Sequence, residues 1–216
     1  MPRKKREWYE GACYHVMGRG NRHCAIYKDK EDYVTFLNLV ASVKTRYPFT
    51  LHAYCLMTNH FHLLITTSND PIWKIMQPIM NHYARTFNQK NGLDGHLFDS
   101  RYASCLIEDD IYFLEVSRYI HLNPVKAQMV REPLAYEYSS YGKYMEKDEL
   151  KEKMSAQKTK CAQMIAGLVD TSRVLSCFKH DPKEQYRMFV EGKISHAEHE
   201  LLIQKDMKED EMWVPW

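Results

Sequence analysis

His60 and His62 are separated by one residue at the start of a segment, 60–67, whose composition is typical of a β-strand. Side chains at positions i and i+2 of a strand point to the same face of the sheet, so both imidazoles can meet one cation. Neutral imidazole binds divalent transition metals well, and two histidines leave coordination positions open for phosphate oxygens and water. An isolated pair of this kind is more often satisfied by ordinary hydrogen bonds, so it indicates a catalytic metal site only together with other signals.

A second set of chemically competent side chains lies in the segment 117–124, where Tyr119 and Asn123 are four residues apart. They are neighbours on one helix face if the helix extends that far. A tyrosine hydroxyl can attack a phosphodiester and form a covalent phosphotyrosine. Asn123 offers an amide oxygen as a third metal ligand, but Pro124 disfavours the α-helical conformation for the residue before it, which leaves His121 as the alternative ligand. Among 15 tyrosines, Tyr119 alone would more often be a packing residue.

Arginines and aromatic residues between positions 83 and 118 are of the kind that grip single-stranded nucleic acid by phosphate contact and base stacking. Scattered arginines are more often simply solvated. The net charge of the chain is only +2, so the overall composition does not indicate a polyanionic partner. Residues 1–145 carry 18 basic and 14 acidic side chains, whereas residues 146–216 carry 12 and 14, so a nucleic-acid surface is expected in the first part. The arginines and aromatic residues that could form such a surface are Arg85, Arg101, Arg118, Tyr83, Tyr102 and His96.

The elements that must position these side chains follow from hydrophobic periodicity. The order strand, helix, strand, strand, helix, strand, helix predicts an α+β fold, with an antiparallel sheet and helices packed mainly on one face. Pro124 is expected to close the last helix. The predicted strands cover 11–17, 50–56, 60–67 and 102–107; the helices cover 30–46, 72–89 and 109 to about 122; and 18–21 forms a turn.

The first domain is predicted to span residues 1–145, followed by a charged linker or helix over 146–160 and a small helical region over 161–216. No apolar run is long enough to cross a membrane, and the N-terminus has no signal-peptide pattern, so we expect a cytoplasmic protein. The six cysteines lie far apart without a CxxC pair, which argues against a structural zinc site, and we expect them to be buried thiols.

Several separate motifs, in the right order over about residues 11–145, resemble the REP-associated tyrosine transposases, which are relatives of the IS200/IS605 transposases. Agreement of several motifs is far more specific than the histidine pair alone or the tyrosine alone. The motifs are Tyr14-His15-Val16, Arg19-Gly20-Asn21, the stretch from Ala53 to Leu64, Gly95-His96-Leu97-Phe98, Arg101-Tyr102 and the stretch from Arg118 to Ala127.

The resemblance implies a ferredoxin-like, HUH-type nuclease domain in which His60 and His62 hold Mg²⁺ or Mn²⁺ and Tyr119 is the nucleophile. Asn123 lies where relatives place a polar third ligand. The expected reaction cleaves single-stranded DNA near hairpins and leaves a 5′-phosphotyrosine and a free 3′-hydroxyl. Thr58 replaces the usual proline and Lys126 replaces the commoner arginine, and neither change is expected to remove activity. The residues expected to contact DNA are Arg19, Asn21, Arg85, Arg101 and Arg118.

Two further hypotheses keep the fold without the reaction. The first is a domesticated protein that binds hairpin DNA but no longer cuts it; intact His60, His62 and Tyr119 speak against this hypothesis. The second is a metal-holding structural or RNA-binding protein, against which a strict single-strand DNA preference would count. The sequence leaves open whether the protein acts as a monomer or a homodimer.

Overall fold

The computed structural model describes residues 7–145, 165 and 167–192. Its centre is a four-stranded antiparallel sheet with the strand order β2-β3-β1-β4. The described elements are β1 (Cys13–Arg19), a 3-10 turn (Asn21–His23), α1 (Lys30–Arg46), β2 (Phe49–Met57), β3 (His60–Thr67), α2 (Ile72–Asn91), β4 (Ala103–Ile107), α3 (Asp110–Lys126), a second 3-10 turn (Pro133–Ala135), α4 (Tyr141–Met145), α7 (Ser172–Ser176) and α8 (Pro182–Glu191).

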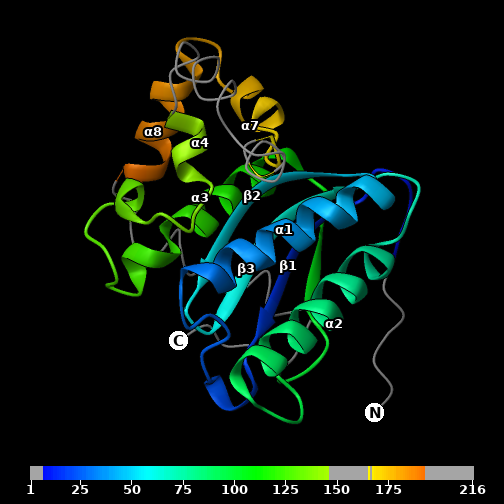
Figure 1. The fold of residues 1–216 in the computed structure, drawn as a ribbon. Coiled ribbons are helices and arrows are strands. Elements are labelled where there is room, and N and C mark those ends of the chain that lie inside the picture. Colours follow the sequence, from blue (N-terminus) through cyan, green and yellow to red (C-terminus); the bar gives the residue numbers. More distant parts are fainter. Residues whose placement is uncertain (1–6, 146–164, 166, 193–216) are drawn as a thin grey trace.

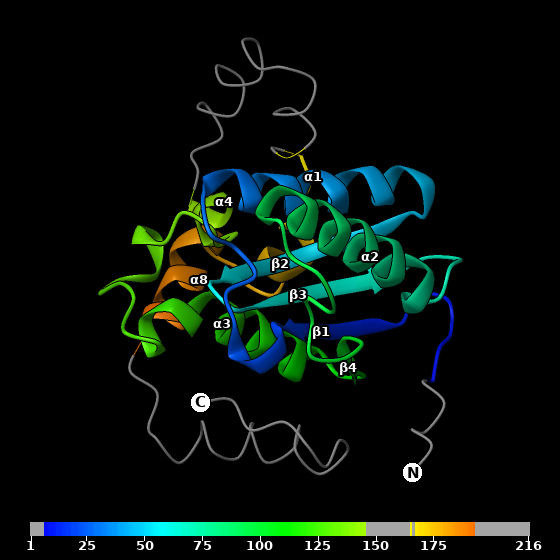
Figure 2. The ribbon, with the colours of Figure 1, turned by 60° about the horizontal axis from the view of Figure 1, so that its bottom comes forward.

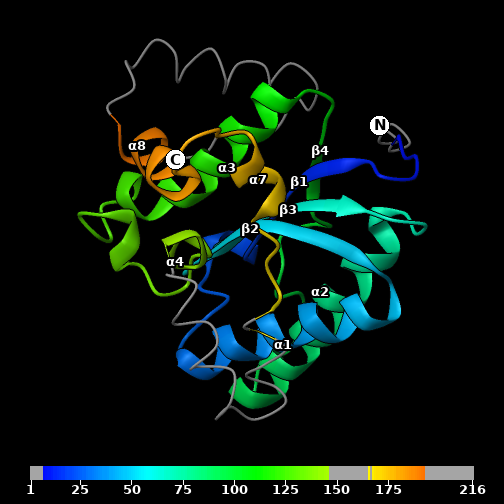
Figure 3. The ribbon, with the colours of Figure 1, turned by 90° about the horizontal axis from the view of Figure 1, so that it is seen from above.

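Helices cover both faces of this sheet. The long helices α1 and α2 lie side by side on one face, while α3, α4, α7 and α8 lie on the other (Figures 1, 2 and 3). The predicted α+β architecture is confirmed, and α1 has the predicted bounds. The second covered face arises because the last predicted helix and the C-terminal helices pack together there.

Side-chain alternation along the strands divides the interior into two cores. On β3, Phe61, Leu63 and Ile65 point toward α1 and α2 and join the larger hydrophobic cluster. Leu64 faces the opposite way, into the smaller cluster beneath α3. By the same alternation His60 and His62 lie on the α3 side of the sheet, so the fold directs the histidines toward the helix that carries Tyr119.

Strand β1 extends farther than predicted. Residues 18–21 were expected to form a turn, but β1 continues through Arg19, which pairs with His60 on β3. Gly20 then bridges to Phe98, and its backbone passes so close to the Cys24 carbonyl that a Cβ atom would lie 2.1 Å from that oxygen. The chain turns only at Asn21–His23, because β1 is a central strand with pairing partners on both sides.

Helix α3 also continues beyond its predicted end. Pro124 was expected to close the helix near Leu122, yet α3 runs through Pro124 to Lys126. A proline within a helix costs one backbone hydrogen bond. The following turn still closes, because the Ala127 N–H donates to the Asn123 carbonyl at 2.9 Å. Asn123 therefore stays on the helix that carries Tyr119.

The C-terminal segment packs directly onto the first domain. Val169 forms a parallel bridge with Leu51 on the edge strand β2, and the Asp170 N–H donates to the Leu51 carbonyl at 2.8 Å. Helices α7 and α8 lie within the predicted helical region, while the predicted linker 146–160 lies outside the described residues. Two cysteines, Cys24 and Cys177, are exposed, which corrects the expectation that all six are buried.

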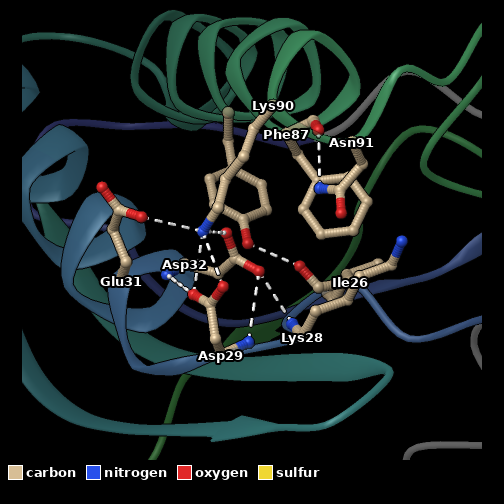
Figure 4. A network of polar contacts seen from close by, with 9 residues as sticks. Ile26, Lys28, Asp29, Glu31, Asp32, Phe87, Lys90 and Asn91 are labelled. Atoms are coloured by element: carbon tan, nitrogen blue, oxygen red, sulfur yellow. Dashed lines mark hydrogen bonds and ion pairs between the residues drawn. The ribbon is translucent and has the colours of Figure 1, made fainter.

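A charged cluster joins the start of α1 to the end of α2 (Figure 4). Asp29 caps α1 by accepting a hydrogen bond from the Asp32 N–H. The Lys90 ammonium, from the last turn of α2, lies 2.8 Å from an Asp29 oxygen, 3.0 Å from Glu31 and 2.9 Å from Asp32. Asp32 also accepts from the Lys28 N–H at 2.8 Å. One lysine thus links the α1 cap to the neighbouring helix.

Replacing Lys90 by methionine is expected to lower the Tm at neutral pH by a few degrees. The Lys90 ammonium holds the pKa of Asp29 below its ordinary value of 3.8. A depressed carboxyl pKa contributes stability above the unfolded-state pKa, and this contribution is lost as pH falls through the folded-state pKa. The Tm difference between wild type and K90M, followed by circular dichroism, should therefore be full at pH 6 to 7 and shrink below about pH 3.8. A difference that is independent of pH would contradict this assignment.

Candidate active site

Tyr119, His60 and His62 meet on one face of the sheet. Tyr119 projects from α3 toward β3, and its ring centroid lies 5.5 Å from that of His62. The His60 and His62 ring centroids are 5.1 Å apart. His62 is fully buried, whereas His60 and Tyr119 are partly exposed. The structure therefore brings the predicted nucleophile and the two predicted ligands together at a point that remains accessible from solvent.

Both histidines of the pair are held in the neutral form. Burial, followed by the charge of Arg19, lowers the pKa of His60 to about 4, and burial chiefly lowers the pKa of His62 well below its ordinary value. The Nδ1 atom of His60 lies 2.7 Å from Oδ1 of Asn59. An amide oxygen can only accept, so the proton is on Nδ1 and the lone pair is on Nε2 of His60. A neutral imidazole with a fixed tautomer is what metal ligation requires.

His15 is a third histidine at this site, and the sequence alone does not indicate a role for it. Its Nε2 atom lies 3.0 Å from Nδ1 of His62, and its ring centroid is 5.8 Å from that of Tyr119. Burial lowers the pKa of His15 to about 3. If the His62 Nδ1–H donates to His15, the lone pair on His62 Nε2 is available to a metal; the opposite arrangement places a proton there.

The matched variants His15→Gln and His15→Leu test this hydrogen bond. Gln can accept the His62 Nδ1–H, whereas Leu removes the acceptor that His15 provides, and a lost buried hydrogen bond costs about 1–3 kcal/mol. We expect H15Q to bind Mn²⁺ about tenfold or more tightly than H15L. Calorimetric titration without DNA measures the difference, and circular dichroism confirms that both variants fold. Equal affinities would show that His15 does not control the tautomer of His62.

Tyr119 and Asn123 are linked within α3. The Asn123 Nδ2 donates to the Tyr119 carbonyl at 2.8 Å, so its amide nitrogen is used as a donor and its oxygen is the atom suited to ligation. Burial raises the pKa of the Tyr119 hydroxyl to about 12, and a hydrogen bond with the Asn123 side chain opposes that rise. At neutral pH Tyr119 is therefore protonated, and positive charge nearby would favour its ionisation.

His121, the alternative third ligand, belongs to the core instead. It is fully buried, with Nδ1 2.8 Å from the Tyr186 hydroxyl and Nε2 2.8 Å from the Ser140 hydroxyl. Both ring nitrogens are thus engaged in hydrogen bonds that join α3 to α8 and to the segment before α4. This arrangement leaves Asn123 as the more suitable third ligand.

The residues predicted to contact DNA are distributed unevenly. Arg19 lies beside the histidines, with its guanidinium 2.9 Å from Asp99, and Asn21 donates to the His96 carbonyl at 3.4 Å. Arg101 is exposed in the loop before β4. Arg85 is exposed on α2, on the opposite side of the sheet, so the fold does not bring it to the site.

Arg118 is buried beneath the C-terminal segment. Its Nη2 donates to the Gly192 carbonyl at 2.7 Å, and its guanidinium lies 4.8 Å from the centroid of the Phe189 ring. Contact between Arg118 and DNA would require this end of α8 to move. A DNA contact from Arg118 therefore stays a prediction.

The donor set determines what kind of ion the site can take. Among the described residues no group of three or more histidine, cysteine, aspartate or glutamate side chains could hold a metal ion. The candidate ligands are instead two imidazoles and one amide oxygen. Three ligands leave the coordination sphere of a divalent ion incomplete, so positions stay open for substrate and water. This set therefore fits a catalytic site better than a closed structural site.

Comparison with known families agrees with this geometry. The family model described as "Transposase IS200 like" matches residues 9–123, which is more than half of the chain. The chain belongs to the IS200-like transposase family. The matched segment contains β1 to β4, the two candidate metal ligands His60 and His62, and Tyr119, and it ends at Asn123. No curated protein matches the chain.

Two solved structures match this IS200-like transposase, and the first of them shares its fold. A REP-associated tyrosine transposase bound to a REP hairpin superposes with a TM-score of 0.56 at 19% identity, covering 67% of this chain and 86% of that one. A putative transposase from Deinococcus radiodurans gives a TM-score of 0.38 at 17% identity, covering 55% of this chain and 95% of that one. Within the described part of the chain, no helix combines the length and apolar character needed to cross a membrane.

Proposed function

We propose that this IS200-like transposase is a metal-dependent single-stranded DNA endonuclease that cleaves and rejoins DNA through a 5′-phosphotyrosine intermediate. The observation that carries the proposal is the meeting of Tyr119 with His60 and His62. Metal-assisted phosphoryl transfer needs a nucleophile beside the metal ligands. Here Tyr119 on α3 lies beside two neutral imidazoles that strand β3 holds on one face. Family membership supports strand cleavage and transfer as the type of reaction.

In the proposed reaction the Tyr119 hydroxyl loses its proton to solvent, and its oxygen attacks the scissile phosphorus. The bond from phosphorus to the 3′-oxygen breaks, and that oxygen takes up a proton. The products are a 5′-phosphate ester of Tyr119 and a free 3′-hydroxyl end. Attack of a 3′-hydroxyl on the phosphotyrosine reverses these steps and rejoins DNA.

His60, His62 and Asn123 would hold the divalent ion, Mg²⁺ or Mn²⁺. When bound, such an ion would polarise the scissile phosphate and stabilise negative charge on its oxygens. The protein contributes the orientation of these ligands. Asn59 fixes the tautomer of His60, and β3 holds both imidazoles on one face.

For the substrate we propose single-stranded DNA beside a hairpin, a class supported by the REP hairpin bound to the REP-associated tyrosine transposase of similar fold. Arg19, adjacent to His60, is suited to hold a phosphate next to the site, and Asn21 and Arg101 extend the proposed contact surface. Because one chain supplies both histidines and Tyr119, a monomer would suffice for cleavage, and a homodimer would hold two such sites. We place the reaction in the cytoplasm, where its DNA lies.

The test is incubation of the full-length protein with Mn²⁺ and labelled single-stranded hairpin DNA from around its own gene, followed by a denaturing gel. We expect a covalent protein–DNA adduct that disappears when EDTA is added. Protease digestion should shift the adduct to a short phosphotyrosyl peptide on the 5′ end of the cleaved strand.

A matched sample holds the same hairpin in fully double-stranded DNA, which should give no adduct. Tight hairpin binding without cleavage of any strand would instead favour the domesticated DNA-binding protein. Adduct formation that is unaffected by EDTA would remove the metal from the mechanism while leaving the tyrosine in place.

A further inference from the structure

Lys126 lies at the end of α3, on the same helix face as Tyr119. It follows Tyr119 by seven residues, or about two helical turns, with Asn123 between them. The Lys126 Nζ is 4.7 Å from the centroid of the Tyr119 ring. One stripe of α3 therefore presents a candidate nucleophile, a candidate ligand and a cation in succession.

The position of this cation is unusual because the residue is exposed while its ammonium end is packed against protein. Lys126 as a whole is exposed to solvent. Burial of the ammonium group, and next the charge of Arg118, lower the pKa of Lys126 to about 8, whereas Glu115 opposes this shift. The charge of Lys126 in turn helps to lower the pKa of His62. The charge of Lys126 thus acts on the histidine side of the site.

Negative charge appears in this place during the proposed reaction. Attack on phosphorus requires a phenolate-like Tyr119 oxygen and increases the charge on the phosphoryl oxygens. Burial alone disfavours the phenolate of Tyr119. A cation held over the tyrosine ring, on a residue that is exposed to solvent, is placed to offset both charges.

We propose that Lys126 is an active-site residue whose ammonium group binds the scissile phosphate beside Tyr119 and stabilises the charge that develops during attack. This inference deepens the proposed function and depends on it. The competing explanation is that Lys126 only packs over the tyrosine ring by a cation–π contact and meets no DNA.

The experiment compares wild type with Lys126→Met and Lys126→Arg in the full-length protein. Single-turnover cleavage of the labelled hairpin strand in Mn²⁺ gives the rate of the chemical step, separately from the DNA affinity. Methionine keeps much of the aliphatic bulk without the charge, and arginine keeps the charge. We expect K126M to cleave about 10²-fold or more slowly and K126R to stay within about tenfold of wild type.

A second measurement needs no cleavage. DNA affinity measured over a range of salt concentrations should show a slope that is smaller by about 0.7 in K126M, the value for one lost contact to a single-strand phosphate. Lys74→Met, on α2 across the sheet, is the matched control and should leave both rate and slope unchanged. Circular dichroism confirms that each variant folds.

The outcomes separate this inference from the proposed function. Wild-type cleavage with an equally fast K126M, or K126R as slow as K126M, would overturn the role of the Lys126 charge while leaving the nuclease intact. If wild type binds DNA but forms no adduct, the proposed function fails. In that case an unchanged salt slope in K126M would overturn the phosphate contact, and a reduced slope would support it.

Discussion

Replacement of Tyr119 by phenylalanine is expected to abolish the covalent adduct and to lower strand cleavage by at least about 10³-fold. The reason is that only the hydroxyl is removed. The phenylalanine ring can keep the edge contacts with the His15 and His62 rings, whose centroids lie 5.8 and 5.5 Å from that of Tyr119. The variant therefore tests the nucleophile without opening a cavity at the site.

The measurement is the same denaturing gel, with wild type and Y119F at equal concentrations and with their hairpin affinities determined in parallel. DNA affinity and Tm should be close to those of wild type, because phenylalanine keeps the ring and the packing, and the loss is that of the hydroxyl with its hydrogen bond to the Asn123 side chain. An adduct of undiminished yield in Y119F would show that another residue attacks the DNA. Loss of the adduct together with loss of folding would identify Tyr119 as a structural residue instead.

The sequence predicted those helices and strands whose bounds depend on local hydrophobic periodicity. The apolar spacing over 30–46 predicted α1 with its observed bounds, and the strand signal over 60–67 predicted β3 in the same way. Since alternation in a strand is strict, the position of His60 and His62 on one face followed from their spacing alone. The α+β order followed from the same signals.

Features that depend on tertiary pairing were not predictable in this way. His15 meets His62 only because β1 and β3 are adjacent, a juxtaposition across 47 positions of sequence. The end of β1 was misplaced because its glycines suggested a turn, although pairing with β3 holds Arg19 in the strand. A signal was present in the Tyr14-His15-Val16 motif, but nothing local indicated what His15 contacts.

His121 and Arg118 illustrate the same limit on α3. Their residue types suggested a ligand and a DNA contact, and the structure buries both against the C-terminal segment. A single sequence could not show which face of α3 would be covered, because the covering helix, α8, begins more than fifty residues after α3 ends. Packing, not helical spacing, therefore favours Asn123 over His121 as the proposed third ligand.

Tyr186→Ala is expected to be the most destabilising substitution considered for this protein, lowering the free energy of unfolding by about 3–5 kcal/mol. Tyr186 is fully buried on α8, and its hydroxyl lies 2.8 Å from Nδ1 of His121 and donates to the Ser117 hydroxyl at 3.1 Å. Its ring centroid is 4.7 Å from that of Tyr144. The alanine variant would leave a cavity and would also remove a hydrogen-bond partner of a buried imidazole.

Tyr186→Phe separates these two effects, because it keeps the ring and removes only the hydroxyl. Leaving His121 Nδ1 without this partner should cost about 1–3 kcal/mol. Urea unfolding followed by circular dichroism measures both variants, and an alanine variant as stable as wild type would show that α8 is dispensable for the fold. Ser117 and His121 flank Tyr119 on α3, so Tyr186 of α8 holds the helix that carries Tyr119 on both sides of that residue. Cleavage by the folded Y186F protein should consequently fall, whereas an unchanged rate would mean that the sheet alone positions Tyr119.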